Sequence, residues 1–469
     1  MPFKFNPPTR AHCSLCDELH KADTAKPVID SHNGKASSAN NYPFHNWYNF
    51  VLGYSPEFPN YMIRKEGMNE ISNILDPFMG SGTTLVCCKA LGIPSQGIDA
   101  NDFMVEAARV KLNWSVSIVE VRRSRDLVLA QCEKALACYG WSEKMQVVAA
   151  NQQMSLLSNS EERPSYRTIV EQRRPEMLLP KYISDKPLAK IYLIHDSIRK
   201  LVVESQVRKL FDLALSSIIL AASNVRYGPG FGVIKPIDDK DVLGIFAAKL
   251  DRIIFDLSSA NDRQKKTKAY VVLGDSRALS DYFEANSMDM MITSPPYPGD
   301  HEYTKHTRLE LIFRGFATNI SEFREIKRRM VRGSTTNLYN DDFDREPVQD
   351  MESIRSITSL IQERLEHDGA TSGFEKLYTK LVWEYFGGMY KVLSQCLKVL
   401  RPGGKIALLV SDSHAFKMVH IQTAKILEEV GERVGFVNPE ILLWQFKPTT
   451  SHKYELRENV LILQKSLVE

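Results

Sequence analysis

The residues of this sequence that are best suited to chemistry are the four of Ser294-Pro295-Pro296-Tyr297. They follow a short apolar run of strand-forming residues that begins after Asp289. Two consecutive prolines make a loop stiff, and the carboxyl end of a buried strand is where α/β sheets bind their ligands. The pattern therefore predicts a prearranged loop that could hold a flat ring bearing an amino group.

The chemistry of such a ring explains the choice of residues. An exocyclic amino group of cytosine or adenine is a poor nucleophile, because its lone pair is delocalised into the ring. If the Ser294 hydroxyl and the Pro295 carbonyl accept its two N–H bonds, the nitrogen is held ready for attack on an electrophile. Pro296 would keep that carbonyl rigid, and Tyr297 would stack on the ring at roughly 1–3 kcal/mol. Taken alone, the tetrapeptide fits an ordinary strand-to-loop exit equally well.

A second motif is the glycine-rich run from Asn73 to Thr84, Asn-Ile-Leu-Asp-Pro-Phe-Met-Gly-Ser-Gly-Thr-Thr. It predicts a strand, a tight turn and the start of a helix. Glycines let a ligand approach the backbone closely, and the first turn of a helix offers free N–H groups to a carboxylate or phosphate. The lysine of a nucleoside-triphosphate loop is absent, and so is the glycine spacing of a dinucleotide site. About one strand later, Asp99 ends the run Gly97-Ile-Asp, a position expected to accept the two ribose hydroxyls of an adenosine-containing ligand.

These two motifs together resemble those of the S-adenosylmethionine-dependent DNA amino-methyltransferases, which make N4-methylcytosine or N6-methyladenine. Three further segments agree with the resemblance: 54–59, 273–276 and the late helix–turn–strand unit around 400–410. The resemblance implies an α/β fold, with a Rossmann-like sheet and helices on both faces. The chain departs from the family in a long stretch after Asn113 that contains no family block, and its residues predict a large, mainly helical insertion. It also implies S-adenosylmethionine as cofactor, double-stranded DNA as partner with the target base flipped out of the duplex, and a cognate restriction endonuclease as functional partner.

The resemblance also assigns roles to individual residues. The catalytic residues would be Ser294, Pro295, Pro296 and Tyr297, with no metal. The residues expected to bind the cofactor are Tyr54, Phe58, Asp76, Pro77, Phe78, Gly80, Ser81, Gly82, Thr83, Thr84, Asp99, Asn101, Asp275 and Ser276. Tyr54 and Phe58 would lie against its methionine part, and Asp275 would contact its adenine. Since serine at the first position of the tetrapeptide goes more often with cytosine in that family, cytosine N4 is the favoured target. Adenine N6, an RNA or protein amide, and a DNA-binding module without turnover are the alternatives.

The order of the blocks predicts how the chain is divided. The cofactor half comes first, at residues 45–115, after an N-terminal arm at 1–44. A helical insertion at 116–268 is the candidate for DNA target recognition, and the catalytic half, 269–469, contains a mobile excursion at 335–372. A sheet can be assembled from either order of its halves, because chain termini tend to lie at the surface.

Net charge is only +3, but basic residues are concentrated after the catalytic loop. Between His301 and Asn337 there are eight Lys and Arg against four Glu. A solvated helix face is the usual reading of such a run, but its position favours contact with a phosphate backbone. A second candidate is a loop of basic, aromatic and glycine residues at 224–232. The residues expected to bind DNA are Arg226, Tyr227, Lys305, Arg324, Lys327, Arg328, Arg329 and Arg332.

The cysteines exclude some classes of protein and of mechanism. Their odd number, seven, and the absence of secretory spacing indicate the cytoplasm. The cluster His12, Cys13, Cys16 and His20 lacks the spacing of a zinc site. Methylation at cytosine C5 requires a cysteine nucleophile on a Pro-Cys turn, whereas Cys396 falls in a helical run. No apolar run is long enough for a membrane span.

Overall fold

The computed structural model describes Val28 and residues 42–141, 165–227, 231–299, 301–369, 373–448 and 455–467. Its centre is a seven-stranded sheet in the order β5-β2-β1-β6-β7-β9-β8. The strands are β1 (Ile74–Asp76), β2 (Ser95–Asp99), β5 (Ala269–Leu273), β6 (Met288–Thr293), β7 (Leu400–Ser411), β8 (Phe436–Pro448) and β9 (Glu455–Lys465). The first five in that order are parallel neighbours, and β9 runs antiparallel to both β7 and β8. The expected Rossmann-like sheet is confirmed.

The strand order explains where a ligand can bind. From β1 the chain proceeds to β2 and later to β5 on one side, and it then returns to β6 on the other side of β1. A crevice opens outside the carboxyl ends of parallel strands at such a reversal. The glycine-rich loop after β1 and the Ser294 loop after β6 therefore lie side by side, although about 200 residues separate them in the chain.

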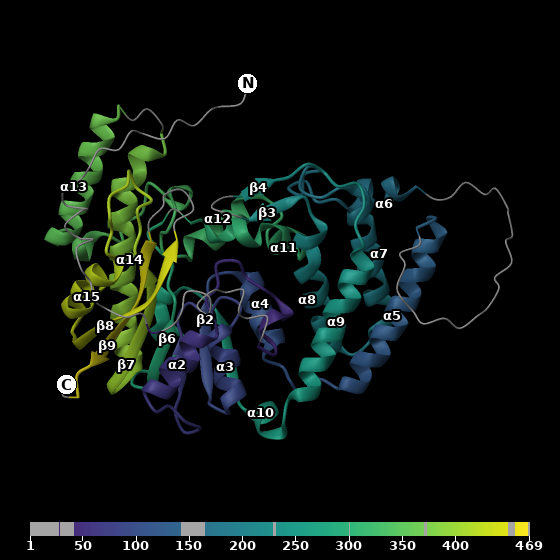
Figure 1. The fold of residues 1–469 in the computed structure, drawn as a ribbon, viewed down its shortest axis with the longest axis horizontal. Helices are drawn as coiled ribbons and strands as arrows, with labels where there is room; N and C mark the ends of the chain where they lie inside the picture. Colours follow the sequence, from purple (N-terminus) through teal and green to yellow (C-terminus); the bar gives the residue numbers. More distant parts are fainter. Residues whose placement is uncertain are drawn as a thin grey trace, which may run out of the picture.

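Helices cover both faces of the sheet because its strands alternate their side chains between two cores (Figure 1). Leu75 and Met291 pack with α14 (Tyr378–Val399) and α15 (Thr423–Val434). Their neighbours Ile74 and Ile292 pack on the other face with α2 (Glu57–Lys65) and α3 (Thr83–Leu91). The helix α4 (Asp102–Lys111) follows β2 and packs near the edge strand β5.

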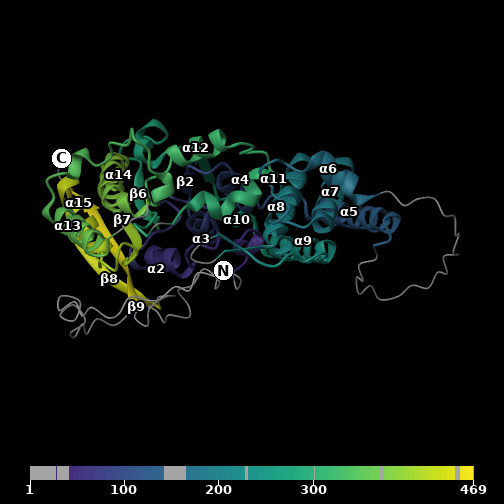
Figure 2. The same cartoon turned by 90° about the horizontal axis from the view of Figure 1, so that it is seen from above.

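Between α4 and β5 the chain forms a mainly helical unit that extends to one side of the sheet (Figures 1 and 2). Its helices are α5 (Ile118–Cys138), α6 (Tyr166–Arg173), α7 (Asp185–Leu201), α8 (Ser205–Ala222), α9 (Val242–Ser259) and α10 (Asp262–Lys266). A small hairpin joins β3 (Val225–Tyr227) to β4 (Phe231–Val233). The core of this unit is continuous with residues of α4 and with Trp114, which stacks on Phe44 with ring centroids 3.8 Å apart. Its role in target recognition stays a prediction.

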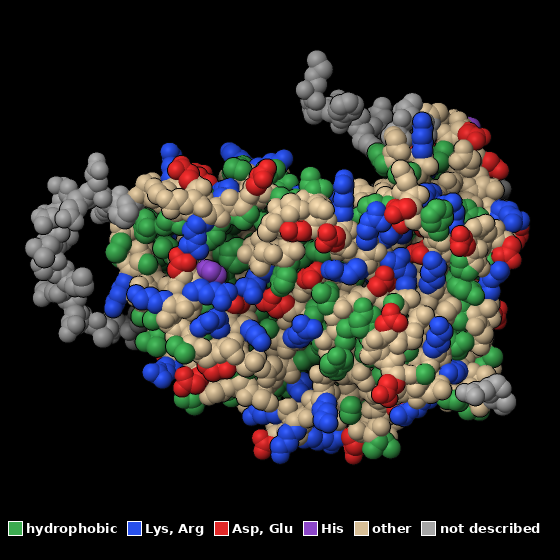
Figure 3. Space-filling view, turned by 180° about the vertical axis from the view of Figure 1, so that it is seen from behind, with side chains coloured by type: hydrophobic (Ala, Val, Ile, Leu, Met, Phe, Trp, Pro, Cys, Tyr) green, Lys and Arg blue, Asp and Glu red, His purple; other side chains and the backbone are tan. Residues whose placement is uncertain are grey.

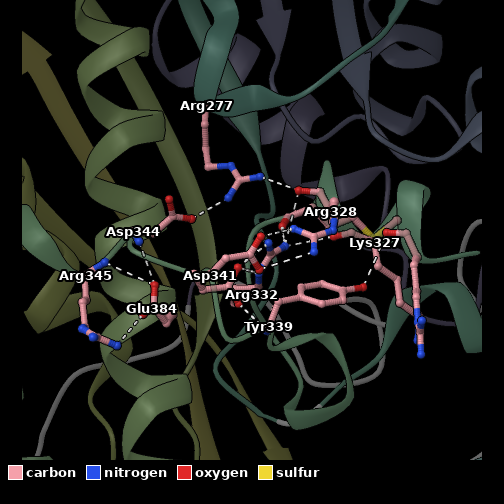
Figure 4. A network of polar contacts seen from close by, with 12 residues as sticks. Arg277, Lys327, Arg328, Arg332, Tyr339, Asp341, Asp344, Arg345 and Glu384 are labelled. Carbon is pink, nitrogen blue, oxygen red and sulfur yellow. Dashed lines mark hydrogen bonds and ion pairs between the residues drawn. The ribbon is translucent and has the colours of Figure 1, made fainter. Parts of the chain in front are cut away.

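After α11 (Arg308–Phe313) and α12 (Ile320–Arg328), the segment 335–372 contains 3-10 turns at Thr335–Asn337 and Glu346–Val348 and the helix α13 (Glu352–His367). The expectation that this segment is a mobile excursion stays a prediction. Ion pairs fix these turns to the catalytic domain: Asp344 lies 2.5 Å from Arg277 and 2.8 Å from Lys391 (Figure 4). The polar composition of the segment reflects these buried ion pairs.

Two expectations fall on residues that cannot be assessed. Apart from Val28, the N-terminal arm up to residue 41 lies outside the described residues, and so does the cluster of His12, Cys13, Cys16 and His20. None of the helices in the described parts of the chain is long and apolar enough to cross a membrane.

Candidate active site

A cleft with an empty volume of about 830 Å³ opens at the carboxyl ends of β1, β2 and β6. Ten of the residues predicted to bind cofactor or target contribute to its wall: Tyr54, Phe78, Gly80, Ser81, Thr83, Asp99, Asn101, Ser276, Ser294 and Pro296. The structure therefore brings the cofactor motif and the target motif to one cavity.

The glycine-rich loop needs its glycines for backbone geometry. Gly80 and Gly82 have φ values of +51° and +85°, a region that other residues rarely adopt. A Cβ on Gly82 would also lie 3.2 Å from the Cβ of Ala108 in α4. Gly82 caps the N-terminus of α3, and Ser81 and Thr83 on either side of it line the cleft. The loop thus presents backbone to the cleft at the positive end of a helix.

Asp99 orders the loop from the neighbouring strand. Its Oδ2 accepts the Gly80 N–H at 2.9 Å, and its Oδ1 accepts the Asn101 N–H at 2.8 Å. Burial raises the pKa of Asp99 to about 6. Each carboxylate oxygen can accept a second hydrogen bond. The group can therefore hold two hydroxyls from the cleft while it still holds the loop.

Asp76, Thr84 and Tyr54 form a network beneath the cleft. The Tyr54 hydroxyl donates to Asp76 Oδ2 at 2.7 Å and lies 2.6 Å from Thr84 Oγ1, which donates to the Ile292 carbonyl. Asp76 is fully buried, and its other oxygen accepts the Phe78 N–H at 3.0 Å. Burial raises the pKa of this carboxyl above its usual value. Asp76 and Thr84 therefore position the loop and the tyrosine, and neither forms part of the cleft wall.

Four other residues predicted to bind the cofactor lie at different depths relative to the cleft: Phe58, Pro77, Asp275 and Ser276. Phe58 is buried against Trp444, with ring centroids 5.7 Å apart, and is part of the core. Ser276 lines the cleft and donates to the Pro77 carbonyl, which ties the loop after β5 to the glycine-rich loop. Asp275 lies outside the wall and pairs with Arg277 at 2.7 Å. Its proposed contact with adenine stays a prediction.

Asn101 has a structural task besides its place in the wall. Its side-chain oxygen accepts the N–H groups of Phe103 and Met104 and so caps α4. Its amide nitrogen donates to Thr307 Oγ1 at 2.9 Å, in the 3-10 turn Tyr303–Thr307. The residue thereby joins the end of the second strand to the segment that follows the catalytic loop.

The catalytic loop is held by the neighbouring strand β7. Ser294 Oγ donates to the Leu409 carbonyl at 3.0 Å and lies 2.9 Å from the Tyr297 hydroxyl. Because the single hydroxyl proton is directed at Leu409, the serine presents lone pairs to its other neighbours. Ser294 and Pro296 line the cleft, whereas Pro295 and Tyr297 lie outside its wall. The stacking role of Tyr297 stays a prediction.

Two charged residues behind Tyr297 carry no motif in the sequence. Glu458 of β9 is buried and accepts from the Tyr297 hydroxyl at 3.4 Å. Lys447 of β8 pairs with Glu458, and its ammonium lies 5.8 Å from the centre of the Tyr297 ring. Burial and the nearby Glu458 carboxylate raise the pKa of Tyr297 far above its usual value, so its hydroxyl stays protonated. The C-terminal hairpin therefore orients the catalytic loop.

Several residues of the cleft were missed by the sequence interpretation. Phe50 and Leu52 come from the segment before α2, Met104 from α4, and Tyr303 and Met330 from the stretch after the catalytic loop. Tyr303 accepts a long hydrogen bond of 3.4 Å from the Tyr297 N–H. These side chains add apolar surface to the cleft, and no single motif could indicate them because they come from separate parts of the chain.

The basic run after the catalytic loop is mostly paired within the protein. Arg332 (Figure 4) is 3% exposed and pairs with Asp342 at 2.7 Å, so its predicted contact with DNA has no support in this arrangement. Lys327 pairs with the buried Glu302 at 3.2 Å. Arg329 pairs with Asp102 at 2.5 Å and lines the cleft.

The remaining predicted DNA contacts keep a more exposed position. Arg324 and Arg226 are exposed, Lys305 is half-buried, and Arg328 shares an exposed ion pair with Asp341. Tyr227 packs its ring on His306, with centroids 5.1 Å apart. On the face drawn in Figure 3, Lys and Arg are interspersed with Asp and Glu and form no single basic patch. The DNA-contact residues thus stay a prediction.

Comparison with known proteins agrees with this geometry. Residues 32–110 match the family model described as DNA methylase, N6_N4_Mtase. The chain is 23% identical over 429 residues to the Type II methyltransferase M.BsoBI of Geobacillus stearothermophilus, an alignment covering 84% of this chain and 79% of that protein. It is 21% identical to the Type II methyltransferase M.AvaI of Nostoc sp., over 86% of this chain and 80% of the relative.

A shorter match is closer. Over 59 residues, which are 13% of this chain and 11% of the relative, it is 46% identical to the Type II methyltransferase M.MjaII of Methanocaldococcus jannaschii. The long matches cover both halves of the sheet, and the family model covers the glycine-rich loop and Asp99. Residues 32–110 thus match an amino-methyltransferase family model, and most of the chain is similar to Type II methyltransferases, which supports an S-adenosylmethionine-dependent amino-methyltransferase family.

Proposed function

We propose that this protein methylates the N4 amino group of cytosine in duplex DNA, with S-adenosylmethionine as donor and the target base flipped into the cleft. One observation carries the proposal: Ser294 and Pro296 line the same cavity as Gly80 and Asp99. A donor held by the glycine-rich loop and an acceptor held by the catalytic loop would share this cavity, as direct transfer requires.

The residues of the cleft fit an adenosine bearing a charged amino-acid chain. Phe78, Met79 and Met104 offer apolar surface for a base and a thioether, and Asp99 offers acceptors for ribose hydroxyls. The bound cofactor would supply a methyl group on a positively charged sulfur. An electrophile of this kind needs neither a covalent enzyme intermediate nor a metal.

The direction of the Ser294 hydrogen bond supports an amino group as the target. Since its proton is donated to the Leu409 carbonyl, the hydroxyl can accept an N–H from a base in the cleft. A donor such as the amino group of cytosine therefore fits this position better than a carbonyl oxygen would. The Tyr297 hydroxyl lies 2.9 Å from Ser294 Oγ and 3.4 Å from Glu458 Oε1, so its single proton can be donated to the serine or to the carboxylate.

We propose cytosine rather than adenine because position 294 is a serine, which goes more often with cytosine in the family that the sequence resembles. The helical unit 116–268 is proposed as the target-recognition region, and a restriction endonuclease of the same specificity is the proposed functional partner. Both proposals concern which DNA sequence is recognised, and the methyl transfer in the cleft does not depend on them.

Expression in a host that lacks DNA methylation, followed by single-molecule sequencing of its genome, tests the proposal. Wild-type protein should mark a cytosine within one short recurrent sequence with the N4-methyl signature, and an equally expressed Ser294→Ala variant should not. Methyl marks at adenine would show that the target base is adenine and would leave the proposed mechanism unchanged. If DNA carries no mark while RNA or protein accepts labelled methyl in vitro, the DNA proposal fails.

A further inference from the structure

One buried charge beside the cleft has no carboxylate partner. Lys111, the last residue of α4, is 1% exposed. Its Nζ donates to Ser81 Oγ at 3.3 Å, and within the described parts of the chain it pairs with no carboxylate. Burial without a counter-charge disfavours the ammonium form and lowers the pKa of Lys111 to about 7. An anion held nearby would favour the charged form.

The other titratable groups near Lys111 do not supply one. They are Cys87 of α3, Lys249 of α9 and His45, which precedes α2. Burial raises the pKa of Cys87 and lowers that of His45, so both are neutral. Lys249 adds positive charge of its own. These neighbours favour an anion from outside the protein.

The cleft is the route by which an anion can come close. Ser81 joins the two, since it accepts the hydrogen bond from Lys111 and also lines the cleft beside Thr83. Thr83 begins the nine-residue helix α3, whose first N–H groups have no acceptor inside the helix. The helix dipole and the lysine therefore place positive potential at the same end of the cleft.

We infer that Lys111, acting through Ser81, recognises the carboxylate of the cofactor's amino-acid part. This inference rests on the assignment of the cleft to S-adenosylmethionine. Lys111 would be a positioning residue that selects ligands carrying the carboxylate and fixes the direction of the amino-acid chain. A bound carboxylate would supply the missing counter-charge, and in the free protein burial lowers the pKa of Lys111 to about 7.

A second buried lysine, Lys89, makes structural contacts only and serves as the control. Lys89 of α3 is 3% exposed, and its Nζ donates to the carbonyls of Thr267 at 2.6 Å and Lys265 at 3.3 Å. Its hydrogen bonds go to the backbone before β5, and it is absent from the cleft wall. Lys89→Met should therefore cost stability without changing which ligand binds.

The test compares two ligands that differ in one group, S-adenosylmethionine and its decarboxylated analogue, by calorimetric titration of the full chain. Lys111→Met should weaken S-adenosylmethionine binding roughly 10- to 100-fold and leave the analogue within about twofold, as expected for loss of a charged hydrogen-bonding partner. Lys89→Met should change neither affinity. Equal losses for both ligands in Lys111→Met would overturn the inference.

Ser81→Ala keeps the buried lysine and covers the case in which Lys111→Met fails to fold. It should also weaken S-adenosylmethionine more than the analogue, and an unchanged ratio of the two affinities would contradict the inference. If the wild type bound neither ligand, the assignment of the cofactor itself would fail, which is a distinguishable result.

Discussion

The carboxylate of Asp99 offers the sharpest test of how the cleft holds its cofactor. It accepts N–H groups from Gly80 and Asn101 at 2.9 and 2.8 Å, and the residue lines the cleft. Asp99→Asn replaces one acceptor oxygen by a donor, so it can satisfy only part of this set. Loss of a charged acceptor for ribose hydroxyls should weaken cofactor binding by about 1–3 kcal/mol, or roughly 5- to 150-fold.

The pH dependence separates this effect from general damage. Since burial raises the pKa of Asp99 to about 6, protonation removes an acceptor as the pH falls through that value. Wild-type affinity should therefore rise between about pH 5 and 7 and then level off. The ligand for this measurement is 5′-methylthioadenosine, which keeps the ribose hydroxyls and lacks the amino-acid part that Lys111 would contact.

The assay is calorimetric titration at half-unit pH steps, with Asp262→Asn as control because Asp262 is exposed on α10. Asp99→Asn should bind weakly and show no rise through pH 6, whereas the control should follow the wild type. If Asp99→Asn bound as tightly as the wild type, or if its affinity still rose through pH 6, Asp99 would have no role in holding the ribose.

Four further predictions concern the catalytic loop and the basic run. Ser294→Ala should lower the single-turnover rate of methyl transfer about 100-fold with cofactor affinity unchanged, because the contact would strengthen only in the transition state; a change in affinity alone would contradict this. Tyr297→Phe should retain appreciable activity and Tyr297→Ala much less, and equal loss in both would show that the hydroxyl matters more than the ring. Arg332→Ala should lower the free energy of unfolding by about 3–5 kcal/mol in urea titrations, since it leaves Asp342 buried and unpaired. Arg328→Ala, which breaks an exposed pair, should lower the free energy of unfolding much less. The double variant Arg324→Ala, Arg328→Ala should lower the slope of log affinity for DNA against log salt by about 0.9 per lost phosphate contact. An unchanged slope would exclude this face of α12 from the DNA interface.

The sequence predicted the parts of the site that are local in the chain. A glycine-rich turn between a strand and a helix, and a proline-stiffened strand exit, are specified by neighbouring residues, and both lie in the cleft. A Rossmann-like sheet with helices on both faces followed from the resemblance. The side-by-side position of the two loops then follows from the reversal of strand order at β1.

What the sequence could not predict depends on contacts between distant elements. Glu458 lies behind Tyr297 only because the last two strands form a hairpin against β7. In the sequence, Arg332 cannot be told from an exposed surface cation. Its buried partner Asp342 follows ten residues later, across a turn that no motif marks. Asp76 was predicted from its motif, but its depth beneath the cleft depends on how Tyr54 folds over it.

The central claim is direct methylation of an exocyclic amino nitrogen on cytosine. The most direct measurement is mass analysis of nucleosides released from DNA that the purified protein has modified with deuterium-labelled S-adenosylmethionine. We predict N4-methyldeoxycytidine carrying the label, in an amount that falls with Ser294→Ala. Labelled 5-methyldeoxycytidine would contradict the account, because methylation at carbon requires a cysteine nucleophile, and none of the free cysteines in the described parts of the chain belongs to the cleft wall.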